Sequence, residues 1–141
     1  MSYKFPFEKL EVWHLSKELA KQIYSLTKGF PGEERFGLIS QMNRAAISIA
    51  STIAEGSARA SRKEQGHFFH LAYGSLMELM CQLTICFELG YVKSEKHESL
   101  RKEIEKISNK LNALRKYQFT VSSIQQLHDS TTQQKSSTNQ R

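Results

Sequence analysis

Both prolines of this 141-residue chain, Pro6 and Pro31, lie in its first quarter, and no proline follows them. Proline disrupts the interior of a helix because it has no backbone N–H and its ring clashes with the preceding turn. The chain after Pro31 therefore carries no residue that forbids helix. Its apolar residues recur at spacings of three and four rather than two, which favours helices over strands.

Four apolar stripes with helical spacing predict four helices, at about residues 8–28, 33–55, 62–89 and 94–119. Each stripe is expected to bury one side of its helix against the other helices. The expected core residues are, in chain order, Val12, Leu15, Leu19, Ile23, Leu26, Ile39, Met42, Ala46, Ile49, Ile53, Phe69, Ala72, Leu76, Leu79, Leu83, Phe87, Leu100, Ile104, Ile107, Leu111 and Leu114.

Glycines and one capping motif mark where these helices end and begin. Gly29, Gly56 and Gly90 are expected to end the first three helices, with Gly29 in the left-handed conformation that glycine adopts readily. Ser61 and Glu64 have the spacing of a capping box, which predicts the start of the third helix. Because the links are short, we expect an all-α fold, an antiparallel up-down-up-down four-helix bundle.

The chain is expected to divide into a bundle at residues 1–119 and a polar tail at residues 120–141. Residues 130–141 contain no aliphatic or aromatic side chain. Such a segment cannot bury enough apolar surface to offset the entropy lost on ordering. We therefore expect the tail to be disordered.

The composition excludes several classes of protein. Two cysteines rule out a disulfide framework and a four-cysteine zinc site. No apolar run approaches the ~20 residues of a transmembrane helix, and the N-terminus lacks the apolar region of a secretory signal. We expect a cytoplasmic protein without a membrane segment. Its net charge of +6 hints at an acidic partner.

The antiparallel topology concentrates positive charge at one end of the bundle. The N-terminus, the link between the second and third helices, and the end of the fourth helix must meet there. Seven basic residues, Lys4, Lys9, Arg59, Arg62, Lys63, Arg115 and Lys116, and four acidic residues, Glu8, Glu11, Glu55 and Glu64, give that end a net charge of +3. Such a patch can hold phosphates, helped by the amides at the start of the third helix. The alternative is a solvated basic surface that binds nothing.

A polar stripe on the second helix is a separate candidate. Arg44, Ser48, Ser51 and Glu55 follow each other at spacings of four, three and four, on a helix that is otherwise apolar. Glu78 lies in an apolar stretch of the third helix, and a buried carboxylate needs a partner. We expect Arg44 to pair with Glu78. Arg44, Glu55 and Glu78 are thus predicted to be structural polar groups or subunit contacts.

No arrangement of residues points to catalysis or to a metal. His67 and His70 lie one turn apart on the third helix, but zinc needs three or four ligands and Cys81 is about three turns from His70. Cys81 and Cys86 are expected to be buried as small hydrophobic residues. The chain has no phosphate loop, no HExxH and no GxSxG motif. We therefore expect a protein that is not an enzyme and holds no metal or cofactor.

Residues 37–56, with the sequence GLISQMNRAAISIASTIAEG, carry a resemblance to a known family. FEKLEVW at residues 7–13, Phe30 with Pro31, and AYGSLME at residues 72–78 support it, as does Arg59. The chain resembles the four-helix-bundle proteins encoded in intervening sequences of bacterial 23S rRNA genes, over about Phe7 to Tyr117. It departs from their pattern at Asn43, where the family often has a second Arg before Arg44, and at Thr52, where Asn is usual.

The resemblance implies a ring-like homopentamer with no established catalytic residues, and RNA or other nucleic acid as the partner usually suggested. A distantly similar pentameric bundle is the accessory protein of diversity-generating retroelements, which binds a reverse transcriptase and nucleic acid. The leading hypothesis is a non-enzymatic oligomer that binds nucleic acid. The alternative is an assembly module that binds a protein and no nucleic acid. The residues expected to contact phosphates are Arg59, Arg62, Lys63, Arg115 and Lys116.

Overall fold

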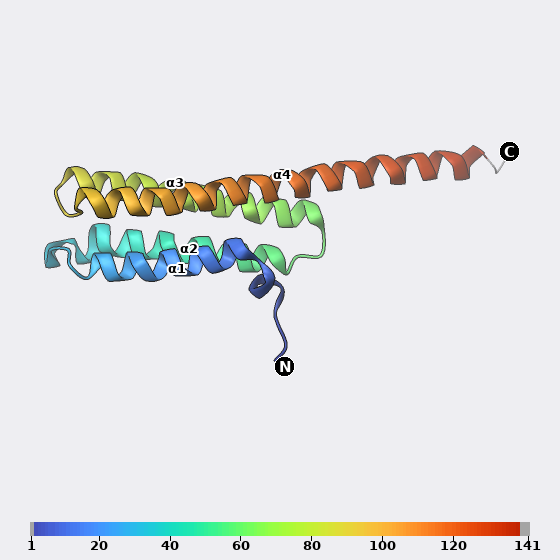
Figure 1. Ribbon diagram of the computed structural model, residues 1–141. Helices are drawn as coiled ribbons and strands as arrows, with labels where there is room; N and C mark the ends of the chain where they lie inside the picture. Colours follow the sequence, from blue (N-terminus) through green and yellow to red (C-terminus); the bar gives the residue numbers. More distant parts are fainter. Residues whose placement is uncertain (1, 139–141) are drawn as a thin grey trace.

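The computed structural model describes residues 2–138, and within them the chain forms an antiparallel bundle of four long helices and no strand (Figure 1). The long helices are α1 (Glu11–Thr27), α2 (Ser40–Ser57), α3 (Arg62–Glu88) and α4 (Ser94–Thr138). The short turns are η1 (Pro6–Lys9), η2 (Gly32–Glu34) and η3 (Arg35–Ile39). The all-α, up-down-up-down prediction is confirmed.

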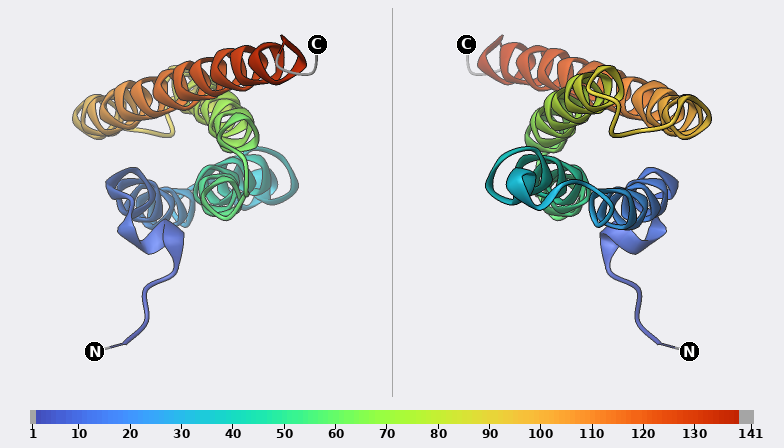
Figure 2. Two further views of the ribbon diagram at one scale, coloured as in Figure 1. Left: turned by 90° about the vertical axis from the view of Figure 1, so that its right-hand side faces the viewer. Right: turned by 90° about the vertical axis from the view of Figure 1, so that its left-hand side faces the viewer.

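The helices pack in two layers, with α1 beside α2 and α3 beside α4 (Figure 2). The α2–α3 link, the N-terminal segment and the middle of α4 lie at one end, which we call the α2–α3 end (Figure 1). The α1–α2 and α3–α4 links lie at the other end. The topology therefore brings together the three chain segments on which the expected basic patch depends.

The apolar stripes predicted from the sequence form the core. Every stripe residue except Phe87 is buried or packs partly buried against the buried cluster. Phe87 is instead 36% exposed and stacks on His97, with ring centres 4.4 Å apart. Its neighbour Cys86 takes the core position, where its thiol donates to the Met42 sulfur at 3.3 Å. The prediction failed here because residues three and four positions after Leu83 both fit helical spacing.

The expectation of a buried Cys81 was also wrong, since Cys81 is exposed.

Of the three glycines predicted to end helices, Gly90 alone has a left-handed backbone conformation. Gly90 has a φ of +82°, and the next N–H, of Tyr91, donates to the Cys86 carbonyl at 2.9 Å, which closes the end of α3. Gly29 does not have a positive φ, because α1 ends in tight turns: its N–H donates to the Leu26 carbonyl at 3.2 Å. Gly56 lies inside α2, which continues to Ser57.

The second helix begins later than predicted, because two irregular turns precede it. Gly37, with φ −109° and ψ −110°, breaks the helical path before Ser40. The Glu34 carboxylate accepts a hydrogen bond from the Leu38 N–H at 3.4 Å and another from the Tyr91 hydroxyl at 3.3 Å. Partial burial, and secondly the Glu34 charge, raise the pKa of Tyr91. Glu34 thus ties the α1–α2 link to the α3–α4 link.

Helix α4 continues to Thr138 rather than ending at the predicted Phe119. No proline or glycine follows Gly90, so no residue forces the backbone out of the helix. The C-terminal part of α4 projects from the bundle (Figure 1), and Ile124 and Leu127 in this part are exposed. That residues 120–138 lack fixed structure in solution stays a prediction, and residues 139–141 of the expected tail lie outside the described part.

Among the helices that the structure describes, none combines the length and the hydropathy needed to cross a membrane.

Candidate nucleic-acid interface

The link between α2 and α3 is fixed by short-range hydrogen bonds. The Ser61 hydroxyl accepts from the Glu64 N–H at 3.1 Å, which confirms Ser61 as the N-cap of α3. The Gln65 side chain donates to the Arg59 carbonyl at 2.8 Å. Arg59 is therefore held against the first turn of α3, beside Lys63.

A contact between α3 and α4 brings Arg62 to the part of α4 that carries Arg115 and Lys116. Arg62 donates to the Gln118 side-chain oxygen at 3.2 Å, and Gln118 lies about one turn from Arg115 along α4. Lys116 is the next residue and is exposed. The structure thus distributes the five predicted contact residues along the start of α3 and the adjoining part of α4.

Each of the three arginines lies over an aromatic ring. The pairs, with the distance from the guanidinium carbon to the ring centre, are Arg59 over Phe68 at 4.5 Å, Arg62 over Tyr117 at 5.9 Å and Arg115 over Tyr73 at 5.0 Å. A cation over a ring is stabilised by roughly 0.5–1 kcal/mol at an exposed site. The contact orients the arginine but leaves its charge uncompensated.

None of the five basic residues forms an ion pair with a described carboxylate. The ion pairs elsewhere include Lys110 with Glu11 at 3.1 Å, which joins α4 to α1. Positive charge that is oriented by rings and not neutralised by acids remains free to attract an anion.

Arg115 is the most constrained of the five. One guanidinium nitrogen donates to His70 Nδ1 at 2.6 Å and the other donates to the Asn112 side-chain oxygen at 2.9 Å. Arginine has no acceptor, so His70 Nδ1 is the acceptor in this contact. The described residues contain no group of three His, Cys, Asp or Glu side chains placed to hold a metal ion. The hydrogen bond from Arg115 to His70 Nδ1 is the contact that orients this arginine on α3.

Two hollows flank the first turn of α3. The larger, of about 620 Å³, is lined by Arg59, Ser61, Lys63, Glu64, His67 and Phe68. The smaller, of about 330 Å³, is lined by Ser61, Arg62, Lys63, Val121, Gln125 and Gln126. Ser61 and Lys63 belong to both, so Lys63 stands on the ridge between them.

The polar stripe of α2 lies along its contact with α3. The Arg44 guanidinium is 3.9 Å from the Glu78 carboxylate, and the Ser48 and Ser75 hydroxyls are 3.0 Å apart. The Glu78 side chain is 48% exposed rather than buried, so the pair is worth at most about 1 kcal/mol. Glu55 is exposed and forms no ion pair with a described side chain. Whether these residues are subunit contacts stays a prediction.

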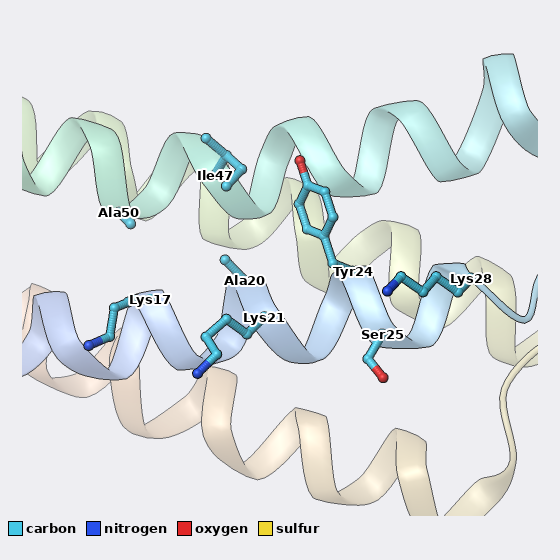
Figure 3. A pocket seen from close by; sticks show the side chains of 8 residues that line it. All are labelled: Lys17, Ala20, Lys21, Tyr24, Ser25, Lys28, Ile47 and Ala50. Atoms are coloured by element: carbon cyan, nitrogen blue, oxygen red, sulfur yellow. The ribbon is translucent and has the colours of Figure 1, made fainter.

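A further groove, of about 440 Å³, runs between α1 and α2 (Figure 3). Tyr24 and Ile47, 43% and 45% exposed, contribute its apolar surface, and Figure 3 shows the Tyr24 ring extending from α1 toward α2. Lys17 and Lys21 of α1, and Lys28 just after its end, also line the groove.

Sequence reasoning missed the aromatic and polar partners of the arginines. His70, Tyr73 and Gln118 contact arginines that lie far away in the sequence. These contacts could be identified only from the register between α3 and α4, the two antiparallel helices on either side of Gly90. Phe68 was missed for another reason, since its ring borders a hollow rather than the core.

The model of the 23S rRNA-intervening sequence protein family matches residues 8–113. The chain belongs to this family. The match includes Arg59, Arg62 and Lys63, whereas Arg115 and Lys116 lie just beyond it. The match confirms the family resemblance found in the sequence.

A solved structure has the same fold. It is the crystal structure of a protein of unknown function from the S23 ribosomal protein family of Bacteroides thetaiotaomicron. The TM-score is 0.68 at 23% identity, and the alignment covers 74% of this chain and 98% of that chain. At this identity the likeness shows the fold alone. The search of curated proteins finds no match, and neither the family description nor that structure names a catalytic activity.

Proposed function

We propose that this 23S rRNA-intervening sequence protein is a non-enzymatic oligomer that binds RNA phosphates at its α2–α3 end. One observation carries the proposal: five basic residues from the start of α3, the preceding link and the adjoining part of α4 form no ion pair with a described carboxylate. The residues are Arg59, Arg62, Lys63, Arg115 and Lys116. The family description, which refers to 23S rRNA, supports RNA as the acidic partner.

The binding mode that this site supports is contact with the RNA backbone. Arginine and lysine side chains attract phosphates irrespective of base sequence, and each contact releases condensed counterions. Affinity should therefore fall steeply with salt concentration. Arg59, Arg62 and Arg115 are oriented in advance by their rings, so they lose less freedom on binding than unsupported side chains.

Self-association is the second part of the proposal, with a pentamer as the family resemblance implies. The outward face of α3 exposes two large apolar side chains on the same side of the helix as Glu78, because each lies seven residues from it. They are Leu71 and Ile85, 46% and 44% exposed. Contact with a second copy would cover these side chains and bury the ion pair. A ring would also repeat the basic patch in every subunit and strengthen its field.

A protein-binding module without direct RNA contact is the competing function. The groove between α1 and α2 favours it, because Tyr24 and Ile47 are exposed there away from the α2–α3 end. In that case the basic residues serve solubility or a protein contact.

Titration of a structured RNA across a salt series distinguishes the two functions. The test variant is the triple charge reversal Arg59→Glu, Arg62→Glu and Lys63→Glu. The matched control, Lys93→Glu, Lys96→Glu and Lys102→Glu, reverses three exposed charges nearer the other end. We expect the test variant to lose binding and the control to keep most of it. An RNA affinity that does not change with salt concentration contradicts the RNA-binding function. An affinity that is the same for the wild type and the triple test variant also contradicts it.

A further inference from the structure

The larger hollow beside the α2–α3 link has aromatic walls as well as charges. The His67 and Phe68 rings are 6.1 Å apart and nearly perpendicular, at 81°. The Arg59 guanidinium lies 4.5 Å from the centre of the Phe68 ring. The volume of about 620 Å³ is within the roughly 300–1,000 Å³ of small-ligand sites. Flat rings and a guanidinium group are the surfaces on which unpaired bases stack.

The two hollows differ in the charged residues that line them, and this difference favours a different part of a nucleotide in each. Glu64 lines the aromatic hollow, and its carboxylate repels phosphate. The neighbouring hollow has Arg62 and Lys63 and no acidic residue in its lining. A nucleotide that lies across the ridge at Lys63 therefore favours one orientation, with its phosphate on the Arg62 side and its base on the Phe68 side.

The walls of the aromatic hollow are held in place without a ligand. The Gln65 side chain fixes the Arg59 carbonyl at 2.8 Å. The backbone of Gly56 approaches Phe68 so closely that a Cβ on the glycine would lie 2.7 Å from the Phe68 Cβ. A site formed in advance avoids part of the ordering cost of binding.

We propose that the hollow lined by Arg59, His67 and Phe68 binds an unpaired nucleobase, so that the protein selects single-stranded or looped RNA over continuous duplex. The proposal rests on the RNA-binding function and adds the class of RNA. In a duplex the bases are stacked inside and reach no side-chain ring unless the pair opens.

The test compares a short RNA strand with the same strand annealed to its complement, at equal salt. The duplex carries more phosphates, so a purely electrostatic site prefers the duplex. We expect the single strand to bind about tenfold more tightly. An RNA containing 2-aminopurine should also change fluorescence on binding, because the probe base stacks in the hollow.

Two variants assign the preference to the hollow. Phe68→Leu retains a Cβ against Gly56, and His67→Ala removes an exposed ring. Each should lower single-strand affinity several-fold and leave duplex affinity and the salt slope unchanged. Phe87→Leu, at the other end of the bundle, is the control and should change neither. If Phe68→Leu does not fold, His67→Ala alone decides the result.

The outcomes separate this inference from the function on which it rests. Salt-dependent binding with equal or greater affinity for duplex, and no effect of either variant, overturns the base site and leaves the RNA-binding function standing. Absence of salt-dependent binding to both RNAs overturns both.

Discussion

A Cβ atom on Gly56 would lie 2.7 Å from the Cβ of Phe68 and 3.3 Å from the Phe69 ring. Gly56 therefore allows α2 to approach α3 at the point where Phe68 supports Arg59. The glycine is required by this approach and not by its backbone angles, since its φ is not positive.

Gly56→Ala should destabilise the fold by roughly 1–2 kcal/mol, because overpacking typically costs 1–3 kcal/mol and better helix propensity returns up to about 1 kcal/mol. The measurement is the free energy of unfolding in urea. The control is Gly32→Ala, where a Cβ meets nothing within 4 Å, and it should leave stability unchanged or slightly raised. Equal effects of the two substitutions contradict the close packing of α2 on α3.

Stability should fall between pH 9 and pH 11, in part because of Cys86. Burial, and secondly the Glu34 charge, raise the pKa of this thiol from 9.0 to about 11. In the unfolded chain the Cys86 thiol loses its proton at a lower pH than in the folded chain. The stabilising contribution of the buried, protonated thiol is therefore complete below pH 9 and is lost as the pH rises through 11. Each pKa unit is worth about 1.4 kcal/mol, so a shift of about two units makes the whole loss of order 3 kcal/mol. Urea unfolding at several pH values should give a shallower decline for Cys86→Ala, and parallel curves refute the assignment.

Removal of residues 120–141 should leave the bundle stable. The projecting part of α4 exposes Ile124 and Leu127 at 62% and 70%, so it adds little buried surface. A helix without tertiary packing is marginal in water at this length. We expect a chain ending at Phe119 to melt within a few degrees of the full chain, with rapid amide exchange in residues 120–138 of the full chain. A large drop in melting temperature means that the segment packs on the bundle.

The sequence predicts the core well because helical spacing alone determines which side of each helix is apolar. It fails between Cys86 and Phe87, where two spacings are allowed and tertiary packing selects one, with Cys86 against Met42 and Phe87 against His97. It also places the α2–α3 end correctly, since antiparallel topology dictates which links meet. The rings beneath the arginines depend on the register between helices, which no local pattern of Arg62 or Arg115 specifies.

Light scattering should give a mass several times the 16.2 kDa of one chain, and the family resemblance predicts five subunits. Leu71→Glu with Ile85→Glu places two charges on the exposed face of α3 and should yield monomers that remain folded. Leu127→Glu, on the projecting part of α4, is the matched control and should not change the mass. A wild-type mass near that of one chain contradicts the proposed assembly.

The salt dependence of RNA affinity in single-charge variants tests the central claim most directly. Each phosphate contact contributes about 0.7 to the slope of log affinity against log salt for a single strand and about 0.9 for a duplex. Lys63→Gln should reduce the slope by about 0.7 for a single strand or about 0.9 for a duplex. Lys93→Gln, at the other end of the bundle, should leave the slope unchanged. Equal slopes for wild type, Lys63→Gln and Lys93→Gln would contradict RNA binding at the α2–α3 end.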